Sequence, residues 1–359
     1  MNTGLCCSVL GFVLVGAIPF SGAQEPLNLV VKREISVDNE KATVFVSPIV
    51  TDADGNMYVR YSDGQHPADA INKITTSGKK LPSLNLANVP DLAEAKIVDF
   101  SVFEGGLVVL AREGGFSLEE VTYVAVFTSD GALQMKTKVG ADIHASQIAA
   151  LASNRFVVAG RAPWGRLDHP GSDWTPKTAV LNDAGQVIEV VRLEHDVAPI
   201  ERDKRTAANG AVRRDRDFEV SLAASTMTTG DDGNVYLMRY GRSGIVFVIS
   251  PNGTVAHRFE LESPSNSSLR EIKVAKHKIA ALFVRGKPDA YSETAVTFVR
   301  TYDANSGKLL SNYVLDPRIP DLMAAYDGNT GFTFFGPEAV DARSPEEADR
   351  IRIFEVGPK

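Results

Sequence analysis

The sequence predicts an all-β fold, a six-bladed β-propeller with four antiparallel strands in each blade. Three observations support this prediction. Strand-and-turn segments recur at nearly equal intervals, helical periodicity of 3.6 residues is almost absent, and the chain has one surplus strand at its start and lacks one at its end.

The first series of repeats consists of β-branched and aromatic runs, most of which end in a turn rich in Asp, Asn, Ser and Gly. The closing glycines fall at positions 78, 131, 185, 253, 307 and 357, so four intervals are 50 to 54 residues and one is 68. Such turn residues suit positive φ and local hydrogen bonding. One interval is long because residues 198–218 form a charge-dense insertion, which we expect to be a solvated connection.

A second series, each a turn followed by an apolar strand, precedes the first. Each unit therefore contains four strands, here called A to D from the innermost outward, with tight A–B and C–D turns and a longer B–C loop. A pair of β-sandwiches or a β-solenoid is the alternative. The second series lies at residues 52–58, 104–109, 153–158, 231–237, 276–282 and 327–334.

The two ends of the chain distinguish the propeller from these alternatives. The last unit stops one strand short, whereas residues 27–37 (LNLVVKREISV) form a strand that belongs to no unit. We expect this strand to complete the last blade, beside residues 351–356, and so to close the ring. The expected domain is residues 24–359, with blades near 38–86, 96–140, 145–194, 219–262, 269–316 and 320–359 plus 27–37.

The N-terminal segment predicts export. Residues 5–20 are apolar, no charged residue precedes Glu25, and the small residues of 21–23 suit cleavage before Gln24. A buried helix or a membrane anchor is the alternative, but the run is shorter than a membrane-spanning helix. Removal of residues 1–23 as a signal peptide takes away both cysteines, Cys6 and Cys7. We therefore expect a secreted or periplasmic protein without a disulfide and without stable membrane insertion.

Composition excludes several classes of protein. The 359 residues are 44% hydrophobic and 23% charged, which is typical of a globular chain and not of a disordered or polytopic membrane protein. The formal net charge of -7 argues against nucleic acid as a partner.

The D-x-D-G-N-x-Y pattern at residues 52–58 (DADGNMY), repeated in part at 231–236 (DDGNVY), resembles the repeat of NHL-like and TolB-like six-bladed propellers. The resemblance implies the fold and not the chemistry, because propellers include binding modules, hydrolases and lactonases.

The B–C loops and the D–A connections of a propeller open on one face. Strand B ends in arginine in five of the six blades, which predicts a ring of guanidinium groups suited to an anionic small molecule or protein segment. The alternative is that each arginine pairs locally with an acid. The five arginines are Arg60, Arg112, Arg161, Arg239 and Arg285.

The third B–C loop, residues 161–176, contains both tryptophans of the chain. Trp164, His169 and Trp174 form a second candidate for ligand contact, for a sugar, a peptide or a partner loop. The alternative is that the tryptophans pack onto the edge of the blade.

Acidic residues at the starts of the A strands should lie near the channel. Resemblance to lactonase-like six-bladed propellers would make Asp99, Glu271 and Asp321 ligands of a Ca²⁺-type cation. The alternative is that they offset the charge of the arginine ring, and no cofactor is then predicted. Gln147, Ser47 and Ser225 occupy roughly equivalent positions in the other blades.

The sequence contains no G-x-S-x-G, H-E-x-x-H, Walker A or C-x-x-C motif. We therefore expect a non-enzymatic ligand- or protein-binding module or scaffold that acts through its B–C loop face. The alternative function is a metal-assisted hydrolase or lactonase with its site in the central channel.

Overall fold

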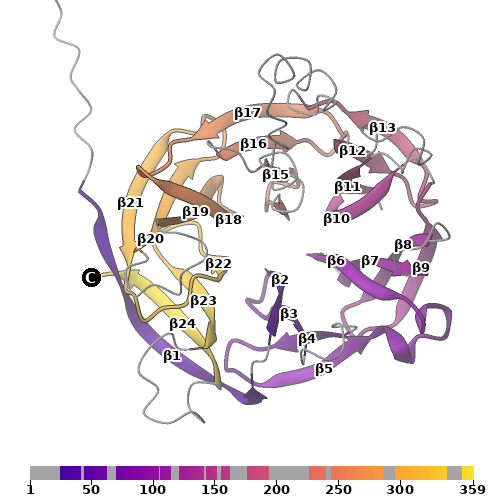
Figure 1. Ribbon diagram of the computed structural model, residues 1–359, viewed down its shortest axis with the longest axis horizontal. Coiled ribbons are helices and arrows are strands. Elements are labelled where there is room, and N and C mark those ends of the chain that lie inside the picture. Colours follow the sequence, from indigo (N-terminus) through magenta and orange to yellow (C-terminus); the bar gives the residue numbers. More distant parts are fainter. Residues whose placement is uncertain are drawn as a thin grey trace, which may run out of the picture.

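Four-stranded antiparallel units follow one another around a ring, with their innermost strands facing a central axis (Figure 1). The fold is therefore all-β and propeller-like, as predicted. This computed structural model describes residues 25–41, 44–62, 70–104, 106–114, 121–140, 143–151, 155–161, 176–193, 226–239, 244–285, 296–337 and 350–359.

The strands of each unit run from the axis outward in sequence order, except that the last outer position is filled by β1. The innermost strands are β2 (Val44–Thr51), β6 (Lys96–Phe103), β10 (His144–Leu151), β14 (Thr226–Thr229), β18 (Ser267–Ala275) and β22 (Met323–Tyr326). The second strands are β3 (Met57–Ser62), β7 (Gly106–Glu113), β11 (Arg155–Arg161), β15 (Val235–Arg239), β19 (Lys278–Arg285) and β23 (Phe332–Pro337). The third strands are β4 (Ala70–Ile74), β8 (Val121–Thr128), β12 (Pro176–Leu181), β16 (Gly244–Ile249), β20 (Val296–Asp303) and β24 (Arg350–Pro358). The outer strands are β5 (Lys80–Asn85), β9 (Leu133–Lys138), β13 (Val187–Val191), β17 (Val255–Leu261), β21 (Leu309–Leu315) and β1 (Leu27–Lys41).

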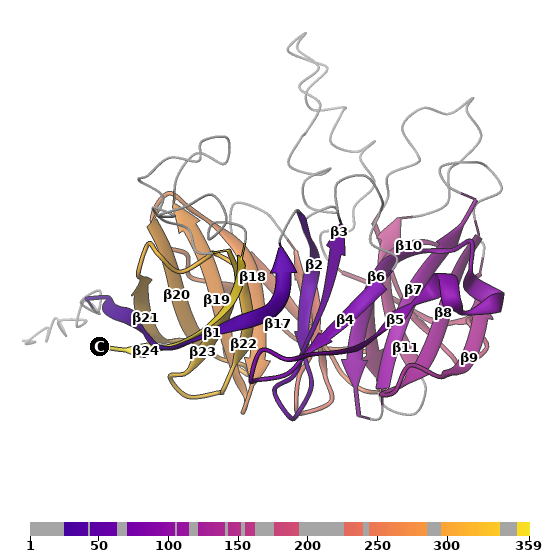
Figure 2. The same ribbon diagram turned by 90° about the horizontal axis from the view of Figure 1, so that it is seen from below.

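The N-terminal strand closes the ring, which confirms the expectation drawn from the two chain ends. β1 pairs antiparallel with β24, from Leu29 opposite Pro358 to Lys41 opposite Arg350. The first residues of β1 also pair in parallel with β21, with Leu27 opposite Tyr313, which the sequence did not predict. This second pairing joins two four-stranded units into one eight-stranded sheet, and Figure 2 shows β1 running along the outside of this part of the ring.

The hydrophobic core lies between adjacent units. Successive side chains of a strand point to opposite faces of its sheet. Phe334 of β23 therefore packs in the cluster shared with β19 and β20, and Phe335 packs in the cluster shared with β3. Both faces of the second strands are buried, as in β7, where Leu107 to Ala111 are at most 3% exposed. Each fully buried phenylalanine contributes roughly 2–3 kcal/mol to folding.

The repeated turn motif is a backbone-capping device. In the β2–β3 turn, Asp52 Oδ1 accepts hydrogen bonds from the Asp54 and Asn56 N–H groups, and the Tyr58 hydroxyl donates to Asp52 Oδ2. In the β14–β15 turn the Tyr236 hydroxyl donates to Asp232, which is the counterpart of Asp54. Each turn contains a glycine with a positive φ, 79° at Gly55 and 75° at Gly233. Glycine adopts this left-handed conformation without strain.

Helical structure is minor among these residues. It consists of two 3₁₀ turns of three residues, η1 (Leu86–Asn88) and η2 (Pro90–Leu92). No helix of the described ranges is long and apolar enough to cross a membrane.

Candidate functional site

The innermost strands enclose a central cavity of about 640 Å³. Residues of all six of these strands, together with Asp321 just before β22, form its wall. Asp99, Gln147, Glu271 and Asp321 all lie on the wall, near the starts of their strands. The side chain of Ser47, as well as Ser225, lies outside the described residues.

β-Bulges position several of these side chains. In β6, β10 and β18 the register shifts by one residue, between Ile97 and Asp99, between Ala145 and Gln147, and between Leu269 and Glu271. At a bulge, two residues of one strand oppose a single residue of its neighbour, and the local twist redirects their side chains. The bulges therefore occur at one level of the cavity, close to where each strand begins.

Hydrogen bonds identify the face on which this level lies. Arg60, four residues into the six-residue strand β3, donates from Nη1 to the carbonyl oxygen of Ile97 near the start of β6, at 2.7 Å. Arg112, near the end of β7, donates from Nη2 to the carbonyl oxygen of Ala145 near the start of β10, at 2.8 Å. Strands A therefore begin on the face where strands B end, the face of the B–C loops. We call this end of the cavity the channel mouth.

The two bonded arginines join neighbouring blades. Both acceptors are carbonyl groups of the residue that immediately precedes a bulge. Arg60 is 6% exposed, and Arg112 is partly buried. A charge-assisted hydrogen bond to a backbone carbonyl across a blade interface stabilises the ring. These arginines therefore have a structural role, with backbone carbonyls of the next blade among their partners.

The other arginines of the predicted ring differ from these two. Arg285 is exposed, donates from Nε to the Ser265 carbonyl at 3.0 Å and lies 4.7 Å from the ring centre of Phe298. The side chains of Arg161 and Arg239 lie outside the described residues, as do Trp164, His169 and Trp174. Their contribution to ligand contact stays a prediction.

Asp99 is a buried carboxylate on the wall of the cavity, 9% exposed. Its Oδ2 accepts a hydrogen bond from the Ile148 N–H group of β10 at 2.8 Å. Burial raises the pKa of Asp99 to about 7, although the N–H groups of Ile148 and Phe100 and the charge of Arg60 oppose the rise. Asp99 therefore links two inner strands and titrates near neutral pH.

Glu271 and Lys273 form an ion pair across the other side of the cavity. Lys273 Nζ lies 2.9 Å from Glu271 Oε1 and donates to the carbonyl oxygen of Ile49 in β2 at 2.6 Å. Burial raises the pKa of Glu271, while Lys273 and a hydrogen bond from the Met323 backbone oppose the rise. The pair thus connects β18 to β22 and, beyond it, to β2, next to the blade that the N-terminal strand completes.

Two charged side chains of the channel mouth remain exposed. Arg270, the extra residue of the β18 bulge, and Asp321, just before β22, both line the cavity. Across the described residues, neither side chain has a hydrogen bond or an ion pair. Arg270 and Lys273 were not among the residues predicted for the site, although both lie close to Glu271 in the segment 269–273 (LREIK) of a predicted innermost strand.

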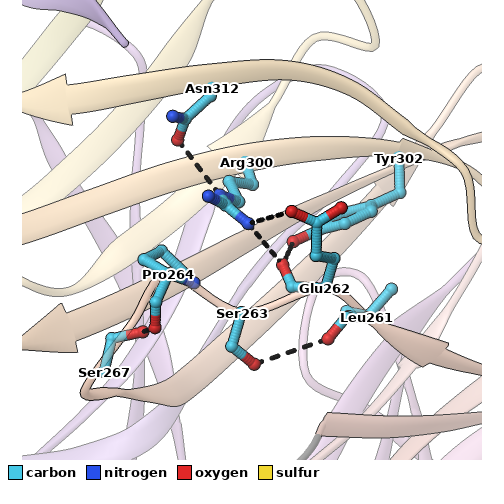
Figure 3. Close-up of polar contacts among 8 residues, drawn as sticks. All are labelled: Leu261, Glu262, Ser263, Pro264, Ser267, Arg300, Tyr302 and Asn312. Atoms are coloured by element: carbon cyan, nitrogen blue, oxygen red, sulfur yellow. Dashed lines mark hydrogen bonds and ion pairs between the residues drawn. The ribbon is translucent and has the colours of Figure 1, made fainter. Parts of the chain in front are cut away.

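The segment that leads into β18 is fixed to its own blade (Figure 3). Arg300 of β20 donates to the Glu262 carbonyl at 2.7 Å and to Asn312 Oδ1 at 3.1 Å, and the Tyr302 hydroxyl donates to the same carbonyl at 2.6 Å. The Ser267 hydroxyl closes the turn on the Pro264 carbonyl. These bonds anchor the start of β18, and so the bulge that carries Arg270.

Four of the charged wall residues, Asp99, Arg270, Glu271 and Asp321, lie before or at the midpoints of the inner strands, whereas Lys273 lies nearer the end of β18. Val50, Val102, Val274 and Tyr326 lie at or near the ends of β2, β6, β18 and β22 and line the opposite part, together with Thr51, Thr228 and Thr229. Side chains of the three valines are partly exposed. Apolar side chains combined with a few placed polar groups are the usual construction of a small-molecule site.

The predicted metal ligands do not gather into a metal site. Among the residues that the structure describes, no three His, Cys, Asp or Glu side chains are grouped so that they could hold an ion. Glu271 and Asp321 are close enough for the charge of Asp321 to raise the pKa of Glu271, whereas Asp99 binds β10. Asp99 therefore has a partner on β10 that Glu271 and Asp321 do not share.

Comparison with known proteins supports the fold alone. No protein-family model and no curated protein sequence matches this chain. A member of the DUF4221 family from Bacteroides vulgatus is similar in structure, with a TM-score of 0.51 and 10% identity over 94% of this chain and 99% of that one. A protein of unknown function from Dyadobacter fermentans has a TM-score of 0.48 and 8% identity, covering 92% and 100%. Virginiamycin B lyase from Staphylococcus aureus has a TM-score of 0.43 and 12% identity, covering 92% and 100%.

Proposed function

We propose that this chain is an exported, six-bladed β-propeller of the NHL-like or TolB-like kind that binds a ligand on its B–C face without catalysis. The ligand carries a carboxylate or another anionic group and enters the channel mouth. The observation that carries the proposal is Arg270, a guanidinium exposed on the wall of a 640 Å³ cavity and without a partner in the described part of the chain.

The contrast with the other arginines supports this role for Arg270. Arg60 and Arg112 donate hydrogen bonds to backbone carbonyls of the next blade, so they stabilise the ring. Arg270 makes no such bond, and its five donors can bind a carboxylate with two parallel hydrogen bonds. A volume of this size suits a small molecule better than a folded protein segment.

Isothermal titration with N-acetylleucine tests the proposal, since this probe combines a carboxylate with an apolar group. We expect binding by the wild type that weakens as salt rises, and an affinity about 10- to 100-fold lower in Arg270→Met, the loss expected for a charge-assisted hydrogen bond. Arg192→Met is the matched control, because Arg192 is also an exposed arginine but does not line the cavity. Equal binding by wild type and Arg270→Met, or no binding by either, contradicts the proposal.

The remaining ring arginines need their own test. The double variant Arg161→Ala, Arg239→Ala binds the same probe more weakly if these arginines also face the ligand. If only this variant loses affinity, then the anion site is the predicted ring and not Arg270.

Export has a separate measurement. We expect the mature protein recovered from outside the cytoplasm to begin at Gln24 and to lack Cys6 and Cys7, as mass spectrometry of the intact chain will show. A secreted chain that retains residues 1–23 contradicts the signal-peptide assignment.

A further inference from the structure

Arg270 and Asp321 place one positive and one negative charge on adjacent blades at the channel mouth. Both side chains are exposed and line the cavity, and within the described ranges they form no ion pair with each other or with a neighbour. Asp321 nevertheless lies within electrostatic reach of Glu271, the residue that follows Arg270. The two unpaired groups therefore lie in the same region of the mouth.

The neighbouring charges are already bound. Glu271 is held by Lys273 at 2.9 Å, and Lys273 is held in turn by the Ile49 carbonyl at 2.6 Å. Because this pair is nearly neutral as a unit, it adds little net field to the mouth. Among the wall residues that the structure describes, Arg270 and Asp321 are therefore the exposed charges that a ligand can meet.

The wall beyond these charges contains apolar side chains beside Thr51, Thr228 and Thr229. Val50, Val102, Val274 and Tyr326 come from four different inner strands and lie farther from the mouth than Arg270. An apolar group bound there gains roughly in proportion to the area that it removes from water.

Resting on the proposed anion-binding function, we infer that the ligand is a compact zwitterion with an apolar body, such as an apolar α-amino acid. Its carboxylate binds the Arg270 guanidinium, its ammonium group binds the Asp321 carboxylate, and its side chain lies against the valines and Tyr326. Oppositely charged groups that are exposed and unpaired in the same mouth are complementary to both ends of such a molecule.

Three related probes separate the two charged contacts. Leucine has both charged groups, N-acetylleucine has only the carboxylate, and leucinamide has only the ammonium group. We expect the wild type to bind leucine about 10-fold more tightly than N-acetylleucine, and leucinamide the most weakly, because a bidentate Arg–carboxylate contact is stronger than a single ammonium–carboxylate pair.

Asp321→Asn identifies the ammonium contact. We expect this variant to bind leucine about 10-fold more weakly than the wild type, and to bind N-acetylleucine at least as well. Asp183→Asn is the matched control, since Asp183 is an exposed residue in the β12–β13 turn, away from the mouth, and carries the same charge change.

The outcomes distinguish the inference from the function on which it rests. If leucine and N-acetylleucine bind equally in an Arg270-dependent way, and Asp321→Asn changes neither, then the inference is wrong and the anion site stands. If neither probe binds, or if leucinamide alone binds, then the proposed function fails and the inference fails with it. A leucine preference that survives in Asp321→Asn also overturns the inference, because another group then receives the ammonium.

Discussion

The two sides of the channel mouth use equivalent strand positions for different purposes. On the side formed by β3, β6, β7 and β10, which we call the closed side, Arg60, Arg112 and Asp99 all bind backbone groups of a neighbouring blade. On the side formed by β18 and β22, the open side, Glu271 and Lys273 bind each other while Arg270 and Asp321 remain exposed. The repeated fold thus determines the position of a charged side chain. Its burial and its neighbours determine whether that side chain stabilises the ring or is available to a ligand.

The difference follows from what each bulge exposes. The bulge of β6 contributes Val98 and that of β10 contributes Ser146, neither of which carries charge, whereas the bulge of β18 contributes Arg270. An uncharged residue at this position presents no cation to the cavity. The exposed cation of the open side is therefore supplied by a single extra residue in one strand.

The largest expected change in stability comes from removing the ion pair between Glu271 and Lys273 on the open side. In Lys273→Met the Glu271 carboxylate and the Ile49 carbonyl lose their partner in a largely buried position, so we expect a loss of about 3–5 kcal/mol in the free energy of unfolding. Urea denaturation measures this loss. The double variant Glu271→Gln, Lys273→Met should lose less, and Lys308→Met, at an exposed position, should stay within about 0.5 kcal/mol of wild type.

If Lys273→Met proves as stable as Lys308→Met, then the pair contributes nothing to ring closure.

The closed side should show a pH dependence that Asp99 controls. The pKa of Asp99 is raised from 3.8 to about 7, so the folded protein retains a proton that the unfolded chain releases. The free energy of unfolding should therefore fall as pH rises from about 4 to about 7, by at most about 4 kcal/mol from this residue, and change little above pH 8. Asp99→Asn keeps an oxygen for the Ile148 N–H group and should remove most of this fall.

Urea denaturation at pH 5 and pH 8 compares the two proteins. Glu271 contributes a fall of the same sign in both, because burial raises its pKa as well. Parallel stability curves for wild type and Asp99→Asn would show that Asp99 is not the titrating group.

A smaller effect is expected at the arginine that joins β7 to β10. Arg112→Met leaves the Ala145 carbonyl without its donor and should cost about 1–3 kcal/mol. Arg192→Met, at an exposed position, should cost no more than about 0.5 kcal/mol. Thermal unfolding of both variants makes the comparison, and equal midpoints would mean that the blade-to-blade hydrogen bond is not stabilising.

Much of the fold could be predicted from the sequence because local residue patterns mark the turns and strands of each repeat. Gly55 and Gly233 mark the tight turns, and the apolar runs between turns mark strands that are buried on both faces. The surplus strand at residues 27–37 predicted the pairing of β1 with β24. The parallel pairing of Leu27 with Tyr313 was not predictable, because it depends on how far β1 extends beyond its own blade.

The candidate site was less predictable than the fold. The sequence predicted Arg60 and Arg112 at the ends of strands B, whereas Arg60 lies four residues into the six-residue β3. Both arginines donate to backbone carbonyls of another blade, and no residue type signals such an acceptor. The bulge that presents Arg270 adds one residue to β18. In the sequence, a strand with such an extra residue looks the same as a regular strand that is one residue longer. The sequence did contain one indication of the site, namely the two cationic residues Arg270 and Lys273 on either side of Glu271.

The contrast between the two sides is tested most directly by one paired measurement on Arg60→Met and Arg270→Met. For each variant the free energy of unfolding and the dissociation constant for N-acetylleucine are determined under the same conditions. We predict that Arg60→Met loses about 1–3 kcal/mol of stability and, while folded, keeps the wild-type affinity. Arg270→Met should keep its stability within about 0.5 kcal/mol and lose about 10- to 100-fold in affinity. If Arg60→Met loses affinity while Arg270→Met loses stability, or if both variants lose the two quantities together, then the division of the mouth into a closed and an open side is wrong.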